Sequence, residues 1–122
     1  SPHINGDGTH SRDFTYIDNV IQINQLAATT ENKDAINEVY NTAFGEQTTL
    51  NELFEALRNA LAKSVPAIAK LEATYGEVRQ GDIPHSLADI SKARALLDYN
   101  PQISIAQGLN EAAEWYLKNL VV

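Results

Sequence analysis

The chain lacks several residue types and patterns, and each absence narrows its chemistry. None of its 122 residues is cysteine, so disulfides, thiolate zinc sites and cysteine nucleophiles are excluded. No apolar run approaches the roughly 20 residues that a helix needs to cross a bilayer, and no N-terminal signal pattern is present. Methionine is also absent, as it would be in a piece cut from a longer protein. We therefore expect a cytoplasmic fragment with no membrane partner.

Positive charge is scarce as well. Nine Lys and Arg residues are set against 16 Asp and Glu residues, which gives a formal net charge of −7. A strongly acidic chain repels phosphate backbones at long range, so nucleic acid is not an expected partner. One or two arginines still suffice to hold a small anion locally. The composition, 43% hydrophobic and 20% charged, is typical of a globular protein, and the length predicts one domain over residues 1–122.

The common catalytic motifs are missing too. No G-x-G-x-x-G turn marks a dinucleotide site, and none of the five tyrosines is followed by lysine four positions later. The histidines His3, His10 and His85 have no metal-ligand spacing, and we interpret them as surface or loop residues. Asp13 and Asp18 are interpreted as helix caps or solvated charges. We expect no complete catalytic site, no metal site and no cofactor bound by this chain alone.

Hydrophobic periodicity predicts a mostly helical chain. Two capping boxes, Thr49-x-x-Glu52 and Ser104-x-x-Gln107, mark the starts of two helices. The helix that Asp18 would cap is apolar around much of its circumference, which predicts deep burial. The predicted elements are an extended segment over 12–16, a helix over 18–29, a strand over 38–43, a helix over 50–63 limited by Pro66, an extended segment over 72–82 with a turn at Gly81, and helices over 86–97 and 105–120.

So few strands make a poor sheet on their own, because two-stranded pieces are marginal in water. The predicted fold class is therefore α+β, mostly helical with a few short strands. Either the helices carry the fold or the strands join a partner.

Two segments carry a family resemblance. The first, 5–20, contains the motif Arg12-Asp13-Phe14, and the second, 78–93, contains Arg79-x-Gly81-Asp82. Further matching features are Val39-Tyr40-Asn41, Thr49 to Leu53, Leu96-Leu97-x-Tyr99-x-Pro101, Gly108-Leu109 and Trp115-Tyr116. In this order and spacing they resemble the C-terminal, substrate-binding region of the extended short-chain dehydrogenase/reductases, and within them the UDP-hexose 4-epimerases.

That resemblance implies a function shared with residues outside this sequence. In such an epimerase an N-terminal Rossmann domain, absent from this sequence, holds NAD. A tyrosine activated by lysine removes the proton of the sugar 4-hydroxyl while hydride passes to the nicotinamide, and hydride then returns to the other face of the 4-keto sugar. The chain alone is expected to be inactive and to bind UDP-sugars weakly. It is also expected to self-associate through the surface that would pack on the Rossmann domain.

The resemblance also implies roles for individual residues. Arg12 and Arg79 would bind the UDP diphosphate, Phe14 would lie near the nucleotide, and Asp82 would accept hydrogen bonds from ribose hydroxyls. Guanidinium groups match phosphate oxygens, and a carboxylate is a pure acceptor suited to a diol. Without the resemblance, the arginines are solvated charges, Asp82 is a turn residue and Phe14 belongs to the core.

Ser86, four residues after Asp82, would line the sugar pocket. By resemblance, a small residue there is typical of enzymes that admit an N-acetyl group at C2, whereas a bulky one restricts the enzyme to UDP-glucose and UDP-galactose. The sequence thus favours UDP-N-acetylglucosamine and UDP-N-acetylgalactosamine. The alternative is that Ser86-x-x-Asp89 caps the following helix.

Two other functions stay open at this point. One is a UDP-glucuronate epimerase or decarboxylase, or a sugar-nucleotide dehydratase, whose C-terminal regions share the two-arginine pattern. The other is a non-enzymatic helical interaction module, which predicts that Arg12 and Arg79 lie far apart on surfaces that do not face one another.

Overall fold

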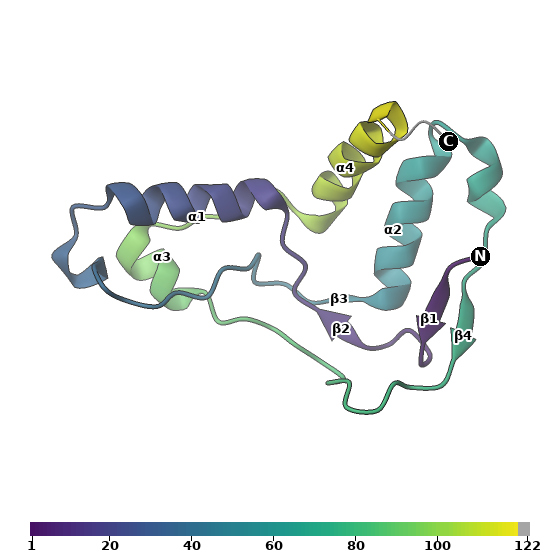
Figure 1. Cartoon of the computed structure of the whole chain (residues 1–122), viewed down its shortest axis with the longest axis horizontal. Helices are drawn as coiled ribbons and strands as arrows, with labels where there is room; N and C mark the ends of the chain where they lie inside the picture. Colours follow the sequence, from purple (N-terminus) through teal and green to yellow (C-terminus); the bar gives the residue numbers. More distant parts are fainter. Residues whose placement is uncertain (120–122) are drawn as a thin grey trace.

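Helices and short strands alternate along an elongated molecule in the computed structural model, which describes residues 1–119 (Figure 1). The helices gather in two groups, one at each end of the long axis. The elements are β1 (His3–Asn5), β2 (Ser11–Arg12), α1 (Ile17–Thr29), the 3₁₀ helix η1 (Lys33–Ala35), β3 (Thr48–Thr49), α2 (Leu50–Ala62), the 3₁₀ helix η2 (Pro66–Lys70), β4 (Thr74–Gly76), α3 (Ser91–Leu97) and α4 (Ile105–Asn119). No helix within this range is long and apolar enough to cross a membrane.

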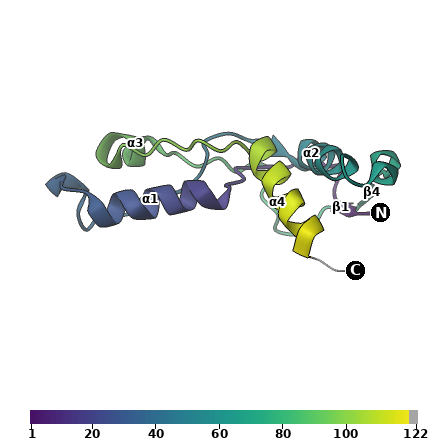
Figure 2. The same cartoon turned by 90° about the horizontal axis from the view of Figure 1, so that it is seen from above.

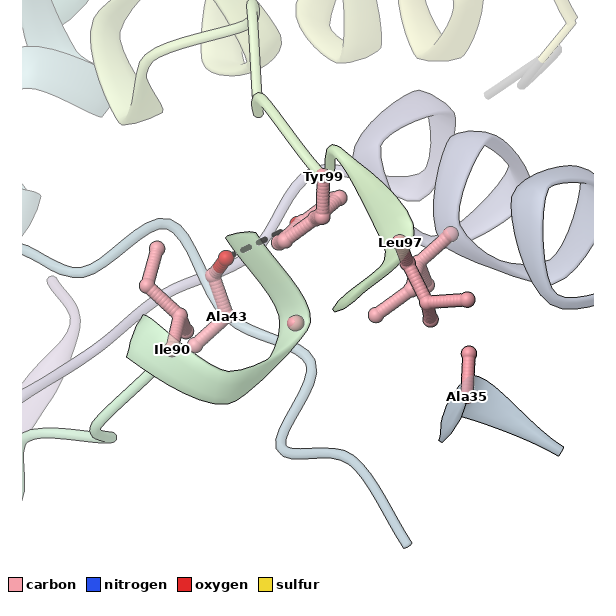
Figure 3. Packing of buried hydrophobic residues seen from close by; sticks show 7 residues of the cluster. Ala35, Ala43, Ile90, Leu97 and Tyr99 are labelled. Atoms are coloured by element: carbon pink, nitrogen blue, oxygen red, sulfur yellow. Dashed lines mark hydrogen bonds between the residues drawn. The ribbon is translucent and has the colours of Figure 1, made fainter. Parts of the chain in front are cut away.

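The main hydrophobic core lies between α1, η1 and α3 (Figure 3). Tyr99 is its largest fully buried side chain, and its hydroxyl donates to the Ala43 carbonyl at 2.8 Å. Burial, and then the negative charge of Asp13, raise the pKa of the Tyr99 phenol, so it stays a hydrogen-bond donor. The remaining buried core residues are Ile23, Ala35, Ala43, Ile90, Ala93 and Leu97.

A second group of helices contains α2 and α4, which pack against each other. Both begin at the predicted capping boxes. The Thr49 hydroxyl accepts from the Glu52 amide while the Glu52 carboxylate accepts from the Thr49 amide, and Ser104 and Gln107 repeat this exchange. Leu120, the predicted end of the last helix, lies outside the described residues.

The four short strands form two separate pairs. β1 pairs with β4 in parallel, with Ile4 opposite Tyr75, and β2 pairs with β3 in antiparallel, with Arg12 opposite Thr48. Helices thus dominate with a few short strands between them, which confirms the predicted α+β class.

Residues Glu38 to Ala43 do not form the predicted strand. β-branched and aromatic residues favour a strand only where a neighbouring strand can pair with them. Here polar contacts hold the segment instead: the Tyr40 hydroxyl donates to the Ala35 carbonyl and the Asn41 amide to the Asp89 carbonyl. The side chain of Val39 is not buried, since 84% of the residue's surface is exposed.

Two predictions about the first helix were wrong. Its N-cap position is Tyr16, and Asp18 falls within the first turn, where a carboxylate favours the helix dipole without capping it. The helix is also less buried than its apolar circumference predicts, because Ile17 and Ile21 are 57% and 46% exposed.

The two remaining differences concern segments of the resemblance motifs. Within the predicted extended segment 12–16, only Arg12 is paired in a strand. The predicted helix over 86–97 begins only at Ser91, so Ser86 does not cap it. The Asp89 carboxylate accepts from the Ser91 amide at 2.8 Å in a local turn. Hydrogen bonding by the Ser91 side chain, and then by its amide, lowers the pKa of Asp89.

Candidate functional site

The two resemblance motifs are joined along β2, although Arg12 and Arg79 are 67 positions apart in the sequence. The Ser11 amide donates to the Pro84 carbonyl at 2.9 Å, and the Ser86 amide donates to the Ser11 carbonyl at 3.1 Å. The hydroxyl of Ser11, itself only 3% exposed, bonds to Nδ1 of His85 at 2.9 Å. Residues 84–86 therefore run beside Ser11 as a further extended segment, and they carry the second motif to the first.

The Arg79-x-Gly81-Asp82 motif forms a tight turn closed by a hydrogen bond from the Asp82 amide to the Arg79 carbonyl at 3.1 Å. Gly81 has φ of +88°, a conformation that a turn of this kind requires at its third position and that glycine adopts without strain. The turn confirms the predicted bend at Gly81 and sets the two charged side chains side by side.

Within that turn, Arg79 and Asp82 form an ion pair. Nη2 and Nε of Arg79 both donate to Oδ1 of Asp82, at 2.9 and 3.2 Å. The Arg79 side chain is 72% exposed and the Asp82 side chain 20% exposed. Both donors meet the same oxygen, so Oδ2 of the carboxylate and Nη1 of the guanidinium stay available to other groups.

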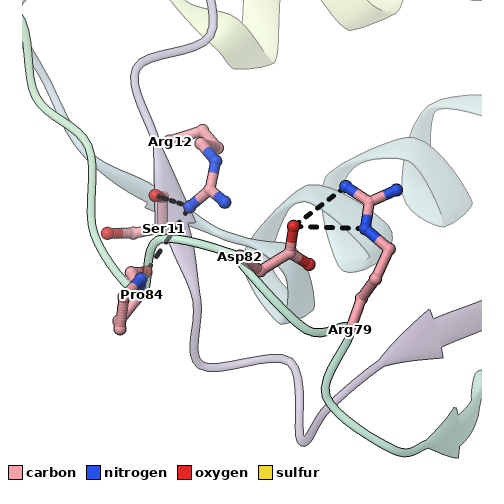
Figure 4. A network of polar contacts seen from close by, with 5 residues as sticks. All are labelled: Ser11, Arg12, Arg79, Asp82 and Pro84. Carbon is pink, nitrogen blue, oxygen red and sulfur yellow. Dashed lines mark hydrogen bonds and ion pairs between the residues drawn. The ribbon is translucent and has the colours of Figure 1, made fainter.

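Arg12, from β2, faces the same place. Its Nη1 donates to the carbonyls of Ser11 and Pro84, at 2.7 and 3.5 Å, which holds the guanidinium next to the second motif (Figure 4). In that view the Asp82 side chain lies between the two arginines. Arg12, Arg79 and Asp82 line one cavity of about 280 Å³, and its other walls come from His3, Ile4, Asn5, His10 and Leu50.

Asp13 has a structural role that the sequence did not reveal. Its carboxylate accepts from the amides of Phe44 (3.1 Å), Gly45 (3.0 Å) and Ala88 (3.4 Å). The interpretation of Asp13 as a cap or a solvated charge was therefore wrong. One carboxylate next to Arg12 ties together three segments that are distant in sequence, and so it fixes the strand that presents the guanidinium.

Phe14 and Ser86 lie away from this cavity. Phe14 is half-buried and does not belong to the cavity wall. Ser86 is exposed, and its amide is bonded to Ser11, beside the strand that holds Arg12. The structure thus brings together three of the five residues singled out in the sequence.

Three polar residues of the cavity wall were missed: His3, Asn5 and His10. One signal pointed to His10. It stands two positions before Arg12, and alternate residues of an extended chain lie on the same side. A search for metal-ligand spacing among the histidines does not detect that relation. Among residues 1–119, no group of three or more His, Asp or Glu side chains could hold a metal ion.

The residues present do not fit a dinucleotide. Gly6 and Gly8 follow β1, but the chain continues into β2 and not into a helix whose N-terminus could receive a pyrophosphate. The first helix, α1, begins after Tyr16 without a glycine turn. Among residues 1–119, neither β1 nor the start of α1 therefore shows the strand–glycine turn–helix arrangement that receives a dinucleotide pyrophosphate.

Comparison with known proteins identifies the family. The sequence profile named GDP-mannose 4,6 dehydratase matches residues 1–112. The chain belongs to the GDP-mannose 4,6-dehydratase family. It corresponds to the C-terminal part of an extended short-chain dehydrogenase/reductase, which confirms the resemblance. The chain spans about a third of the length of the curated relatives it matches.

Three solved structures of the family illustrate its range. The UDP-glucose 4-epimerase of Thermotoga maritima with UDP-glucose is 34% identical and superposes with a TM-score of 0.84, over 99% of this chain and 36% of its own. The UDP-N-acetylglucosamine 4-epimerase of Methanobrevibacter ruminantium with UDP-N-acetylmuramic acid is 35% identical, with a TM-score of 0.82, over 98% and 36%. The UDP-glucuronic acid 4-epimerase of Bacillus cereus with UDP-glucuronic acid and NAD is 36% identical, with a TM-score of 0.77, over 99% and 36%.

Proposed function

We propose that residues 1–122 form one substrate-binding domain, the nucleotide-sugar-binding portion of an NAD-dependent UDP-sugar 4-epimerase. The observation that carries this proposal is the shared cavity of Arg12 and Arg79, two residues 67 positions apart in the sequence that line it together with Asp82. Solved relatives with UDP-sugars, one of them also with NAD, support the substrate class and the cofactor of the whole protein.

In this proposal the two arginines bind the diphosphate. A guanidinium presents planar, parallel N–H donors that match phosphate oxygens, and it remains charged at every physiological pH. Arg12 is already held by two backbone carbonyls, so little conformational freedom is lost when it binds. Arg79 is held by Asp82 and can turn toward the ligand while keeping that partner.

Asp82 accepts the ribose hydroxyls in the same proposal. Oδ1 is occupied by Arg79, and Oδ2 remains as an acceptor for a hydroxyl next to the diphosphate. The arginine thereby positions the carboxylate, and the carboxylate limits the rotation of the arginine. Phe14 near the nucleotide remains part of the proposal, although only its half-buried position beside the Arg12 strand supports it.

The rest of the epimerase is proposed to be an N-terminal Rossmann domain that carries NAD and the catalytic tyrosine and lysine. NAD would exchange hydride with the sugar, and this chain would anchor the UDP while the sugar turns over. Apolar residues that a partner domain would cover are exposed here, among them Ile17, Ile21 and Val39. The same residues support self-association of the isolated chain.

One alternative function keeps direct support. The relative named for UDP-glucuronic acid is about as identical to this chain as the relative named for UDP-N-acetylglucosamine, so a uronate epimerase remains the second candidate. The interaction module required Arg12 and Arg79 to lie on surfaces that do not face one another, and they line one cavity instead.

The proposal predicts different activities for the full-length gene product and for residues 1–122 alone. The full-length gene product should interconvert UDP-sugars epimeric at C4, and residues 1–122 alone should show no turnover above background in the same coupled assay. Isothermal titration should detect no micromolar binding of UDP-N-acetylglucosamine to residues 1–122, because half of the pocket wall is missing. Micromolar binding without any added domain would contradict this assignment.

Ser86 is proposed to leave room for an N-acetyl group at C2 of the sugar. Replacing Ser86 with tyrosine in the full-length gene product should lower kcat/KM for UDP-N-acetylglucosamine about tenfold or more relative to UDP-glucose, because the pocket then rejects the larger substituent. Leu87→Tyr is the matched control, since Leu87 is exposed and this variant places the same tyrosine side chain one position away. An unchanged ratio of the two kcat/KM values in Ser86→Tyr would remove this specificity role.

A further inference from the structure

His10 offers a third basic group to the cavity of Arg12 and Arg79. The residue is half-buried, and it lines the same cavity as both arginines. It comes immediately before β2, and its carbonyl accepts from the Leu50 amide at 3.0 Å, which extends the β2–β3 pairing by one residue. Two positions separate His10 from Arg12, so the alternation of an extended chain places them on the same side.

The net positive charge of Arg12, Arg79 and Asp82 is smaller than the negative charge of the proposed ligand. Arg12 and Arg79 supply two positive charges, and Asp82 cancels one of them through its ion pair. A nucleoside diphosphate ester of a sugar carries two negative charges. One further positive charge in the wall would therefore neutralise the ligand, and imidazole is the one side chain that ordinarily gains or loses a charge between pH 5 and 8.

The groups that face His10 can be named element by element. His3 comes from β1, Arg12 from β2, and Arg79 and Asp82 from the turn, while α2 contributes only the uncharged Leu50 to the wall. Asp7 lies nearby in the loop before His10. The hydrogen bond from the Thr9 hydroxyl is the main cause that lowers the pKa of Asp7, and the charge of His10 adds to it.

His3 differs from His10 in one decisive respect. Nδ1 of the His3 ring bonds to the Thr74 hydroxyl across the β1–β4 pair, at 3.0 Å. The His10 ring makes no hydrogen bond to the residues that the structure describes, so both of its nitrogens are available to a ligand.

We propose that His10 is a third diphosphate-binding residue whose protonated imidazole makes the binding of a UDP-sugar proton-linked. This inference rests on the proposed function of the cavity. Linkage gives the direction of the pH dependence. Because the bound diphosphate stabilises the protonated ring, binding takes up a proton, and the affinity falls as the pH rises and the ring loses its charge. Because the site is half-exposed, the loss from pH 5.5 to pH 8.0 is about fivefold in Kd.

Isothermal titration of the full-length gene product with UDP-glucose tests the proposal. Both phosphates of UDP-glucose are diesters, so the ligand itself keeps a constant charge between pH 5.5 and 8.0. Wild type should lose affinity as pH rises, His10→Gln should bind at every pH as wild type does at pH 8.0, and His3→Gln should keep the pH dependence of wild type. Each variant should melt within a few degrees of wild type.

The outcomes distinguish the role of His10 from the proposed function of the cavity, on which it rests. A flat pH profile in wild type, or a pH dependence retained in His10→Gln or lost in His3→Gln, overturns the role of His10 while binding that needs Arg79 still supports the cavity's function. If Arg12→Gln and Arg79→Gln bind UDP-glucose as wild type does, the diphosphate is not in this cavity, and both proposals are overturned.

Discussion

Replacing Arg79 with glutamine is expected to weaken UDP-sugar binding by the full-length gene product about 10- to 100-fold, the effect of losing a hydrogen bond to a charged group. The fold should not change, because the Arg79 side chain is 72% exposed and, among residues 1–119, its polar contacts are those of the ion pair with Asp82. Loss of the guanidinium also frees the Asp82 carboxylate, whose negative charge then opposes the diphosphate. Isothermal titration measures the change in Kd, and thermal melting checks the fold.

Two further variants make the Arg79 result specific. Arg58→Gln removes a guanidinium that lies over Phe54 and donates to the Leu71 carbonyl, outside the cavity, so its Kd should stay within about twofold of wild type. Arg79→Lys keeps the charge but not the planar pair of donors, so its Kd should lie between those of wild type and Arg79→Gln. Equal losses in Arg58→Gln and Arg79→Gln would indicate a general effect of net charge and contradict a specific contact.

Replacing Asp13 with alanine should lower the free energy of unfolding by about 3 kcal/mol, since charged hydrogen bonds contribute about 1.5–3 kcal/mol each and the three amides are not equally close. The Phe44, Gly45 and Ala88 amides would all lose their acceptor. Tyr99 should be affected as well, because its hydroxyl holds the neighbouring Ala43 carbonyl. Urea unfolding of the chain followed by circular dichroism measures the loss.

A matched acid serves as the control for Asp13. Asp18 lies five residues later in the first turn of α1 and is exposed, so Asp18→Ala should cost no more than about 0.5 kcal/mol. Asp13→Asn keeps one oxygen acceptor without the charge and should fall between the two. If Asp13→Ala and Asp18→Ala unfold at the same urea concentration, the carboxylate of Asp13 does not tie the three segments together.

Signals that act within a few residues were sufficient to predict parts of the fold. The capping box at Thr49 and Glu52 closes over four consecutive residues, so its sequence alone fixes the start of α2. Ser104 and Gln107 do the same for α4. The turn at Gly81 is equally local, because a positive φ at that position is nearly free of strain only for glycine.

Predictions failed where the outcome depends on distant residues. A strand over 38–43 needs a partner strand, and none among residues 1–119 pairs with it. The apolar pattern of α1 predicts that the helix has something to pack against, but not which residues supply it. The Ser86 amide is bonded to Ser11 and the Ala88 amide to Asp13, which lies 75 positions before Ala88, and no local rule for helices includes those bonds.

The candidate site, too, has residues that could be predicted from the sequence and a geometry that depends on distant residues. The arginines and Asp82 were found by resemblance and by the match of their chemistry to a diphosphate and a diol, while their meeting in one cavity depends on the pairing of residues 84–86 with Ser11. Asp13 carries no signal of its own, and His10 carries only its place two positions before Arg12. Their roles follow only from which backbone amides and which side chains the fold brings within reach.

A crystal structure of the full-length gene product with UDP-glucose tests the central claim most directly. The account predicts nitrogen atoms of both Arg12 and Arg79 within hydrogen-bond distance, about 2.7–3.2 Å, of oxygens of the same diphosphate. A diphosphate bound elsewhere, or touched by only one of these two side chains, would contradict it.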